Sequence, residues 1–428
     1  MMNVANIDYL RVKKRDLLLK RYEIFKRNNK PLRVVEIDDG TVIPFVPNMC
    51  NDGSYECGVL NDQFNFIPES GDIDFPNLVE DYGREHSAET GQELTVMYCG
   101  HLTGHWGHFI TDNLSRLWAA VDGKYEFDRI VFVRQPGENN TPVGNILECL
   151  KMLHLDSKID IIESPVRYKK ILVPESGCIP RHHFSSDTTR VYDLIAEEAM
   201  KGASDDYPDK IFMSRSKLDK ALKVEHDLKW FDRFFLSNGY AIIYPEQLDI
   251  KDTIRYIRKA QTVAAFSGTL PHNMLFGNPG QNITIIEKYA NINNYQPGID
   301  LIRNLNVTYV DANALIWSVS AGYGPFIVYP NKWLQKFAAD HQMIIAEPWD
   351  ESHLRHILRD YFREFKRHYG YQWFMNEWLE EEIELLREAY RDSYKDFGGW
   401  LDGSKPLFIK DIISLRNFAK RIYHKLKH

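Results

Sequence analysis

A base, an acid and a cation recur at four-residue spacing in one short stretch of the chain. His108, Asp112 and Arg116 follow a segment rich in glycine and histidine, residues 100–107. Apolar residues at three- and four-residue spacing predict a helix over residues 106–121, in which four residues overshoot a full turn by only about 40°. We therefore expect the three side chains to line one helix edge, where they could transfer a proton beside an anionic substrate. The alternative is a surface pair of His108 and Asp112, with Arg116 in solvent.

The same stretch also permits a metal-site interpretation, because histidines four residues apart on a helix can chelate zinc. His101, His105, His108 and Asp112 are the ligand types that such a site needs. The zinc-protease pattern His-Glu-x-x-His is absent from the sequence, and the glycines weaken the front of the stretch as a helix. We expect no metal here.

Two predicted strands in the second half of the chain end in groups that suit a nucleotide. The strand at residues 210–214 ends in Ser214 and Arg215, and the strand at residues 240–244 is followed by Glu246. Ligands of open α/β sheets bind beyond the carboxyl ends of the strands, so Arg215 is placed for a phosphate. The Glu246 carboxylate could accept hydrogen bonds from ribose hydroxyls, or it could hold Arg215 in place.

A third predicted strand, residues 263–267, leads into a glycine turn and a helix start. Gly268 would let the backbone approach a ligand closely, and the free N–H groups of the new helix favour a pyrophosphate. The polar residues around this turn are Ser267, Thr269, His272 and Asn273. Each signal alone has an ordinary explanation, such as a serine or threonine that merely caps a helix. Three such strand ends in one domain predict a nucleotide-binding cleft.

Length, charge and cysteine usage bound the class of protein. The 428 residues exceed what one hydrophobic core usually supports, which predicts two domains with appendages. A net charge of −7 disfavours nucleic acid as a partner. Five cysteines without a C-x-x-C pair indicate buried thiols in a reducing compartment. No secretory leader and no apolar run of about 20 residues are evident, so we expect a cytoplasmic protein.

The order of predicted elements divides the chain into four parts. A basic amphipathic helix comes first, then a Rossmann-like domain, a second Rossmann-like domain and a helical extension. We place these parts at residues 1–30, 31–200, 205–329 and 330–428. From residue 94 onward, strands and helices alternate, which favours a largely parallel sheet with helices on both faces. Residues 48–92 are expected to be irregular.

The extension should contain helices at residues 353–366, 372–390 and 411–427. The last of these is basic and amphipathic. It could rest on an anionic membrane surface as a peripheral contact, or it could be an ordinary packed terminal helix with a solvated face.

In their order and spacing, four motifs resemble glycosyltransferase family 61. They are His-Phe-Ile-Thr-Asp-Asn-Leu-Ser-Arg-Leu from residue 108, Lys-Ile-Phe-Met-Ser-Arg-Ser from residue 210, Gly-Tyr-Ala-Ile-Ile-Tyr-Pro-Glu-Gln-Leu from residue 239 and Ser-Gly-Thr-Leu-Pro-His-Asn-Met-Leu-Phe from residue 267. The resemblance covers roughly residues 94–288. It implies an α/β protein of the GT-B type, with two Rossmann-like domains facing across a cleft and here a C-terminal helical extension. It also implies inverting, metal-independent transfer from a nucleotide-sugar.

The resemblance assigns roles to individual positions. The nucleotide diphosphate and ribose of the donor would be held by Arg215, Ser267, Gly268, Thr269 and Asn273. The first domain would face them with His108, Asp112 and Arg116. Many relatives carry His-Gly-Ala where this chain has Phe-Ser-Gly at residues 266–268. The leaving phosphate then lacks an imidazole there, unless His272 takes its place.

Either Asp112 or His108 could be the base that activates the acceptor hydroxyl, and the two could also act together. We favour Asp112, because a carboxylate accepts a proton without needing a particular tautomer. The expected partners are a nucleotide-sugar and a glycan or glycolipid acceptor in the synthesis of capsule, lipopolysaccharide or another surface glycan. Two other functions fit the same residues: a non-catalytic carbohydrate- or partner-binding protein, and a related transferase of a non-sugar group such as pyruvyl.

Overall fold

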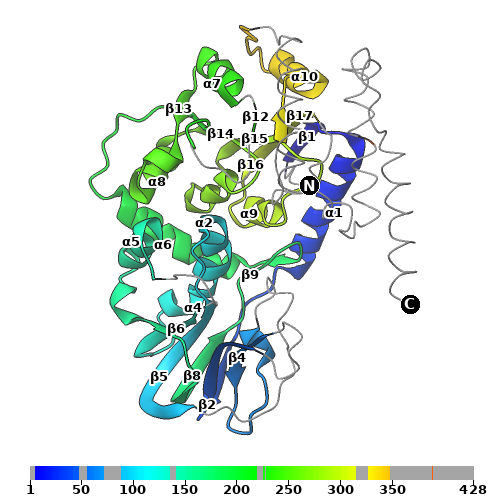
Figure 1. The fold of residues 1–428 in the computed structure, drawn as a ribbon. Coiled ribbons are helices and arrows are strands. Elements are labelled where there is room, and N and C mark those ends of the chain that lie inside the picture. Colours follow the sequence, from blue (N-terminus) through cyan, green and yellow to red (C-terminus); the bar gives the residue numbers. More distant parts are fainter. Residues whose placement is uncertain are drawn as a thin grey trace, which may run out of the picture.

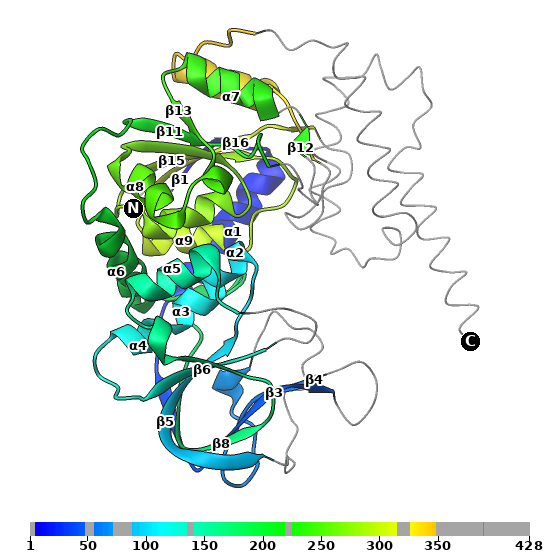
Figure 2. The ribbon, with the colours of Figure 1, turned by 60° about the vertical axis from the view of Figure 1, so that its left-hand side comes forward.

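The computed structural model describes residues 5–47, 55–71, 88–134, 141–218, 225–226, 228–314 and 326–347, together with position 388. Two large sheets lie at opposite ends of the molecule, with a layer of helices between them (Figures 1 and 2). The helices predicted after residue 350, and with them the membrane contact, fall outside these residues apart from position 388. None of the described helices is long and apolar enough to cross a membrane.

One sheet is entirely parallel, with six strands in the order β1-β16-β15-β14-β11-β13. Its strands are Ala5–Tyr9 (β1), Lys210–Met213 (β11), Ala241–Ile243 (β13), Thr262–Phe266 (β14), Asn282–Glu287 (β15) and Asn306–Asp311 (β16). The sequence predicts β11, β13 and β14 to within one residue at each end. Their apolar, β-branched runs are typical of strands in parallel sheets.

The N-terminal segment belongs to this parallel sheet, which the sequence does not predict. In place of the single helix expected in residues 1–30, the structure has strand β1 and helix α1 (Val12–Asn28). Strand β1 pairs with β16, about 300 residues later in the chain. Helix α1 is also anchored by Lys14, which is 1% exposed and forms buried ion pairs with Glu287 at 2.8 Å and Asp311 at 3.0 Å.

The other sheet is mixed, with the order β4-β3-β8-β5-β6-β7 and with β2 beside β8. Its strands are Val34–Asp38 (β2), Thr41–Pro47 (β3), Tyr55–Leu60 (β4), Glu89–His101 (β5), Arg129–Val133 (β6), Ile159–Ile162 (β7) and Val166–Pro174 (β8). The expected parallel arrangement is confirmed for β5 to β8. That expectation begins at residue 94. The earlier strands β2 and β3 follow one another along β8 in one antiparallel register, and β4 pairs antiparallel with β3. Strand β4 also lies in the stretch that we expected to be irregular.

Helices cover the sheets and connect their strands. The α-helices after α1 are Trp106–His108 (α2), Leu114–Arg116 (α3), Trp118–Val121 (α4), Gly144–Met152 (α5), Thr189–Met200 (α6), Leu228–Ser237 (α7), Ile250–Lys259 (α8), Gln296–Ile302 (α9) and Lys332–Asp340 (α10). Short 3-10 helices lie at Pro68–Ser70, Asp156–Lys158, Ser186–Thr188, Pro245–Gln247 and Leu270–Phe276. Two small sheets are formed by Cys178–Ile179 (β9) with His183–Phe184 (β10), and by Glu225–His226 (β12), Phe326–Val328 (β18) and Asn313–Ala314 (β17).

One hydrophobic core runs from the mixed sheet through the central helices to the parallel sheet. It joins Met97 of β5 and Leu172 of β8 to Ile283 of β15, by way of helix residues such as Leu114 and Ile195. Each such side chain contributes about 1.5–3 kcal/mol when fully buried. The two sheet units are therefore held together by their packed helices.

The four cysteines in the described residues are buried thiols, as the sequence predicts. Burial raises the pKa of the Cys99 thiol to about 12, which leaves it protonated and unreactive.

Candidate active site

His108 and Asp112 form the pair that their spacing predicts. His108 ends α2, and Asp112 lies in the π-helical turn Phe109–Asn113. The imidazole Nδ1 is 2.8 Å from the Asp112 Oδ2, and the other carboxylate oxygen accepts a hydrogen bond of 3.0 Å from the Thr111 hydroxyl. The His108 side chain is 44% exposed, against 19% for Asp112. The carboxylate thus orients an imidazole that a substrate can reach.

A tyrosine from the second half of the chain contacts both residues of this pair. The Tyr295 hydroxyl is 3.3 Å from His108 Nδ1 and 3.4 Å from Asp112 Oδ2, and the His108 and Tyr295 rings meet edge to face. Tyr295 directly precedes α9, after strand β15 of the parallel sheet. The edge of the first unit therefore faces the second unit. Sequence reasoning missed Tyr295, because the loop that carries it has no periodic pattern.

Arg116 does not share the edge of His108 and Asp112. A π-helical turn takes one more residue than an α-helical turn, so the positions that follow it are rotated relative to a continuous helix. The Arg116 Nη2 donates to the Gly71 carbonyl at 2.6 Å. The guanidinium lies against Gly100, where a Cβ would be 3.4 Å from Nη1 and where φ is +78°. The Arg116 guanidinium therefore lies beside the end of β5, and not on the helix edge that carries His108 and Asp112.

The two sequence stretches that carry the motifs touch each other directly. The Trp106 indole Nε1 donates to the Asn273 Oδ1 at 3.1 Å. A Cβ on Gly107 would lie only 2.9 Å from the Thr269 Oγ1, so the Thr269 side chain packs against the Gly107 backbone because residue 107 has no side chain. Both contacts join α2 to the turn that follows β14.

His272 is buried beneath this contact and stays neutral. Its Nε2 lies 3.0 Å from the Asn293 Oδ1, and its ring is 4% exposed. Burial, and to a lesser degree the nearby His108 and His105, lowers the pKa of His272 to about 4. At neutral pH the ring carries no charge, so His272 cannot replace the missing imidazole as a cation for a leaving phosphate.

Two cations share one carboxylate at the carboxyl edge of the parallel sheet. Arg215 follows β11, and its Nη1 is 3.6 Å from the Glu225 Oε1; Lys288 follows β15 and forms an ion pair with the same oxygen. The side chains of Lys288 and Glu225 are 2% and 3% exposed. Gly268 has φ +126°, and a Cβ there would be 3.4 Å from the Lys288 Nζ. The strand-end rule that selects Arg215 would also have selected Lys288.

The remaining predicted residues of this edge brace its turns. Ser214 is buried and its hydroxyl accepts from the Ser216 backbone N–H at 3.1 Å. The Ser267 hydroxyl accepts from the Lys288 backbone N–H at 3.2 Å. Glu246 lies on the surface of the 3-10 helix after β13. Desolvation raises the pKa of Glu246, and the charge of Arg215 opposes that rise.

The histidines of the first stretch do not gather around a common point. The His101 ring packs edge-on against Phe45, whereas the His105 ring lies 5.1 Å from that of His108. In the part of the chain that the structure describes, no three histidine, cysteine or acidic side chains come together as a group that could hold a metal.

The fold and the site define a mixed α/β protein in which an oriented imidazole adjoins the cationic edge of a parallel sheet, an arrangement that suits group transfer from an anionic donor. Residues 106–284 match the family model Glycosyltransferase 61, and this segment of the chain is similar to that family. No curated protein matches the chain. The matched segment contains the His108–Asp112 pair, Arg215 and the Gly268 turn, and it ends before Lys288. The match of this segment indicates glycosyltransferase activity.

Proposed function

We propose that the protein is an inverting glycosyltransferase of the GT-B type that moves a sugar from a nucleotide-sugar to a hydroxyl of a glycan or glycolipid, without a metal. The parallel unit would bind the donor, and the mixed unit would present the base. The observation that carries the proposal is the direct contact of α2 with the turn after β14. This contact brings the His108–Asp112 pair next to the turn that holds Gly268.

The donor diphosphate would bind between Arg215 and Lys288. These two positive charges suit the two phosphates, and Gly268 lets the diphosphate lie close to the backbone. In the free protein Glu225 is the anion that neutralises both cations. We propose that the diphosphate takes over this role and displaces the carboxylate. Glu246 and Ser267 lie at the same sheet edge and would contact the ribose or brace the cations.

The proton of the acceptor hydroxyl would go to His108. The acceptor oxygen attacks the anomeric carbon, the bond from that carbon to the phosphate oxygen breaks, and the nucleoside diphosphate leaves with the electron pair. The proton passes to the imidazole Nε2, the nitrogen that does not face Asp112. Asp112 orients the ring and stabilises the imidazolium that forms. The sequence alone favours Asp112 as the base, but hydrogen bonds to both of its oxygens support a positioning role. Arg116 would position the helix from behind.

We further propose an acceptor in surface-glycan synthesis and a place in the cytoplasm, or at the inner face of the membrane through residues 411–427. The family match supports a glycosyl acceptor, and the basic composition of these residues supports the membrane contact.

A panel of nucleotide-sugars tests the proposal. We expect the protein to hydrolyse or transfer from at least one of them, and to be stabilised thermally by the matching nucleoside diphosphate or monophosphate among UDP, GDP and CMP. The variant His108→Ala should bind the same nucleotide and lose turnover. Stabilisation by a nucleotide without turnover of any sugar, in wild type as in the variant, would favour a non-catalytic binding protein. No response to any nucleotide would contradict the proposal.

A further inference from the structure

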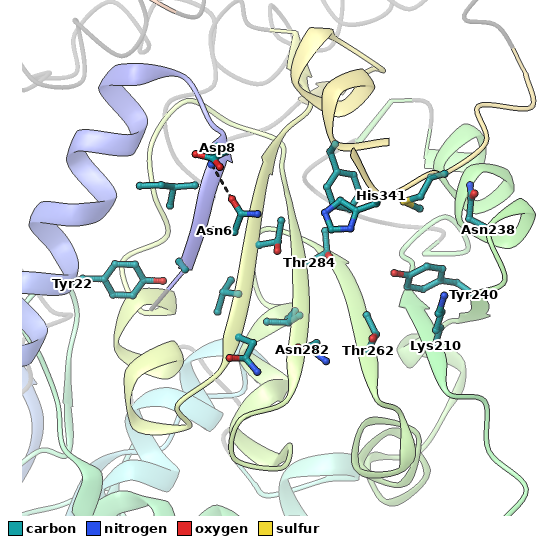
Figure 3. Close-up of a pocket in the computed structure, with 18 of the residues that line it drawn as sticks. Asn6, Asp8, Tyr22, Lys210, Asn238, Tyr240, Thr262, Asn282, Thr284 and His341 are labelled. Carbon is teal, nitrogen blue, oxygen red and sulfur yellow. Dashed lines mark hydrogen bonds between the residues drawn. The ribbon is translucent and has the colours of Figure 1, made fainter. Parts of the chain in front are cut away.

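Within the described residues, half of one face of the parallel sheet is left uncovered. Near their carboxyl ends, the strands bury Phe212, Phe266 and Ile286 on this face under α7 and α10. Near their amino ends, the alternate positions of the same face are polar. These positions are Lys210, Thr262, Asn282, Thr284, Asn306 and Thr308, and they line a pocket of about 1180 Å³ below the end of α10 (Figure 3). Fully parallel sheets are normally covered on both faces, so an open polar half-face indicates a binding surface.

The strand register arranges the polar groups in two rows. In the first row, consecutive partners cross four strands, from Lys210 through Thr262 and Asn282 to Asn306. The second row joins Thr284 and Thr308, and continues to Asn6 of β1. Neighbouring strands lie about 4.8 Å apart, and alternate residues of one strand about 7 Å apart. Apart from Lys210, which only donates, the result is a regular grid of hydroxyl and amide groups that can donate and accept hydrogen bonds. The Asn282 and Asn306 amides each already make one donation, to the Gln261 and Gly280 carbonyls.

The charges around the pocket balance each other. Its rim carries the acids Asp8 and Glu23 and the bases Lys26 and Lys210. Lys26 lies 3.6 Å from Glu23, and the Lys210 ammonium lies 5.7 Å from the ring centre of the neighbouring tyrosine, Tyr240. Such a rim attracts neither a polyanion nor a polycation. The polar grid instead matches a ligand that is neutral and rich in hydroxyl groups.

We propose that this pocket binds a neutral oligosaccharide, namely a segment of the acceptor glycan away from its reacting end. The inference rests on the proposed function, because it takes the acceptor to be a glycan. The pocket lies at the amino edge of the sheet, whereas Arg215 and Gly268 lie at the carboxyl edge. Strands of five to six residues separate these edges by roughly 15–20 Å, so the sugar bound in the pocket is not the one that reacts. It provides a second attachment point that increases the affinity of longer acceptors.

Calorimetric titration with neutral linear hexasaccharides (cello-, xylo-, malto- and chitohexaose) tests the inference. We expect saturable binding of at least one of them by the full chain. The double variant Thr284→Val/Thr308→Val keeps the shape of the sheet and removes two hydroxyls, and it should weaken binding about tenfold. The matched control Thr189→Val, on α6 outside the pocket, should leave the affinity unchanged. A second variant, Asn282→Trp, should abolish binding by filling the first row.

Absence of saturable binding to all four hexasaccharides would overturn the inference, as would binding only of a sulfated hexasaccharide. Equal affinity of the wild type and a folded double valine variant would also overturn it. Transfer assays distinguish this failure from failure of the proposed function. Sugar transfer without hexasaccharide binding would exclude the pocket as a glycan site and leave the proposed glycosyltransferase activity standing. Hexasaccharide binding without sugar transfer would support the pocket as a glycan site and exclude the proposed catalysis.

Discussion

Replacing Gly107 by alanine should destabilise the protein, although the same change within a helix normally stabilises. A Cβ at this position would lie 2.9 Å from the Thr269 Oγ1 and 3.1 Å from its Cγ2. Overpacking of this kind costs roughly 1–3 kcal/mol, whereas the better helix propensity of alanine returns about 0.5–1 kcal/mol. We expect the free energy of unfolding to fall by about 1 kcal/mol, near the middle of the roughly 0–2.5 kcal/mol that the difference between these opposing effects spans. The change should also lower turnover, because the strain lies between the two motif stretches.

A double-mutant cycle assigns this loss to the contact itself. Thr269→Ala removes both clashing atoms, so Gly107→Ala/Thr269→Ala should recover most of the stability. Urea unfolding of the four proteins, followed by circular dichroism, should give a coupling free energy of about 1 kcal/mol or more. Gly104→Ala is the matched control, because a Cβ there meets no atom within 4 Å. A Gly107→Ala protein as stable as the wild type, with no coupling to residue 269, would show that residues 107 and 269 are not in tight contact.

Four further substitutions test the site and its surroundings. Asp112→Asn should lower kcat at least about a hundredfold and leave the calorimetric affinity for the donor unchanged; near-normal turnover would exclude Asp112 from the mechanism. Arg215→Ala and Lys288→Met should each weaken binding of the nucleoside diphosphate at least about tenfold, and unchanged binding would place the nucleotide elsewhere. The Asp300 carboxyl is buried and accepts hydrogen bonds from the hydroxyls of Tyr22 and Tyr309. Its burial raises its pKa from 3.8 to about 6. Its contribution to stability is therefore complete below pH 3.8 and is lost as the pH rises through 6, in total about 3 kcal/mol. Asp300→Asn should lack this loss in urea unfolding between pH 4 and 7.5, and an unchanged pH dependence would contradict the assignment.

The sequence predicts the parallel sheet well because most of its strands have a recognisable local pattern of apolar residues. Continuous apolar runs such as residues 262–266 and 282–287 are bounded by polar turns, and helix α8 is amphipathic and capped by Asp249. The rule that ligands bind at carboxyl strand ends then selects Arg215 and Gly268 without any structure.

The sequence fails where distant segments or irregular turns decide the outcome. Strand β1 has only five residues, and its partner β16 lies about 300 residues away, so no local pattern reveals the pairing. The π-helical turn Phe109–Asn113 rotates Arg116 away from the edge that regular helix geometry predicts. Tyr295 reaches the site from an irregular connection and Glu225 from the two-residue strand β12, and neither segment is long enough or regular enough to show a periodic pattern.

A structure with an intact nucleotide-sugar bound tests the central claim most directly. We expect the diphosphate between Arg215 and Lys288, against the Gly268 backbone, with Glu225 displaced. The anomeric carbon should then face His108, with room for an acceptor hydroxyl within hydrogen-bonding distance of the imidazole. A diphosphate bound away from Arg215 and Lys288, or a sugar turned away from His108, would contradict the account.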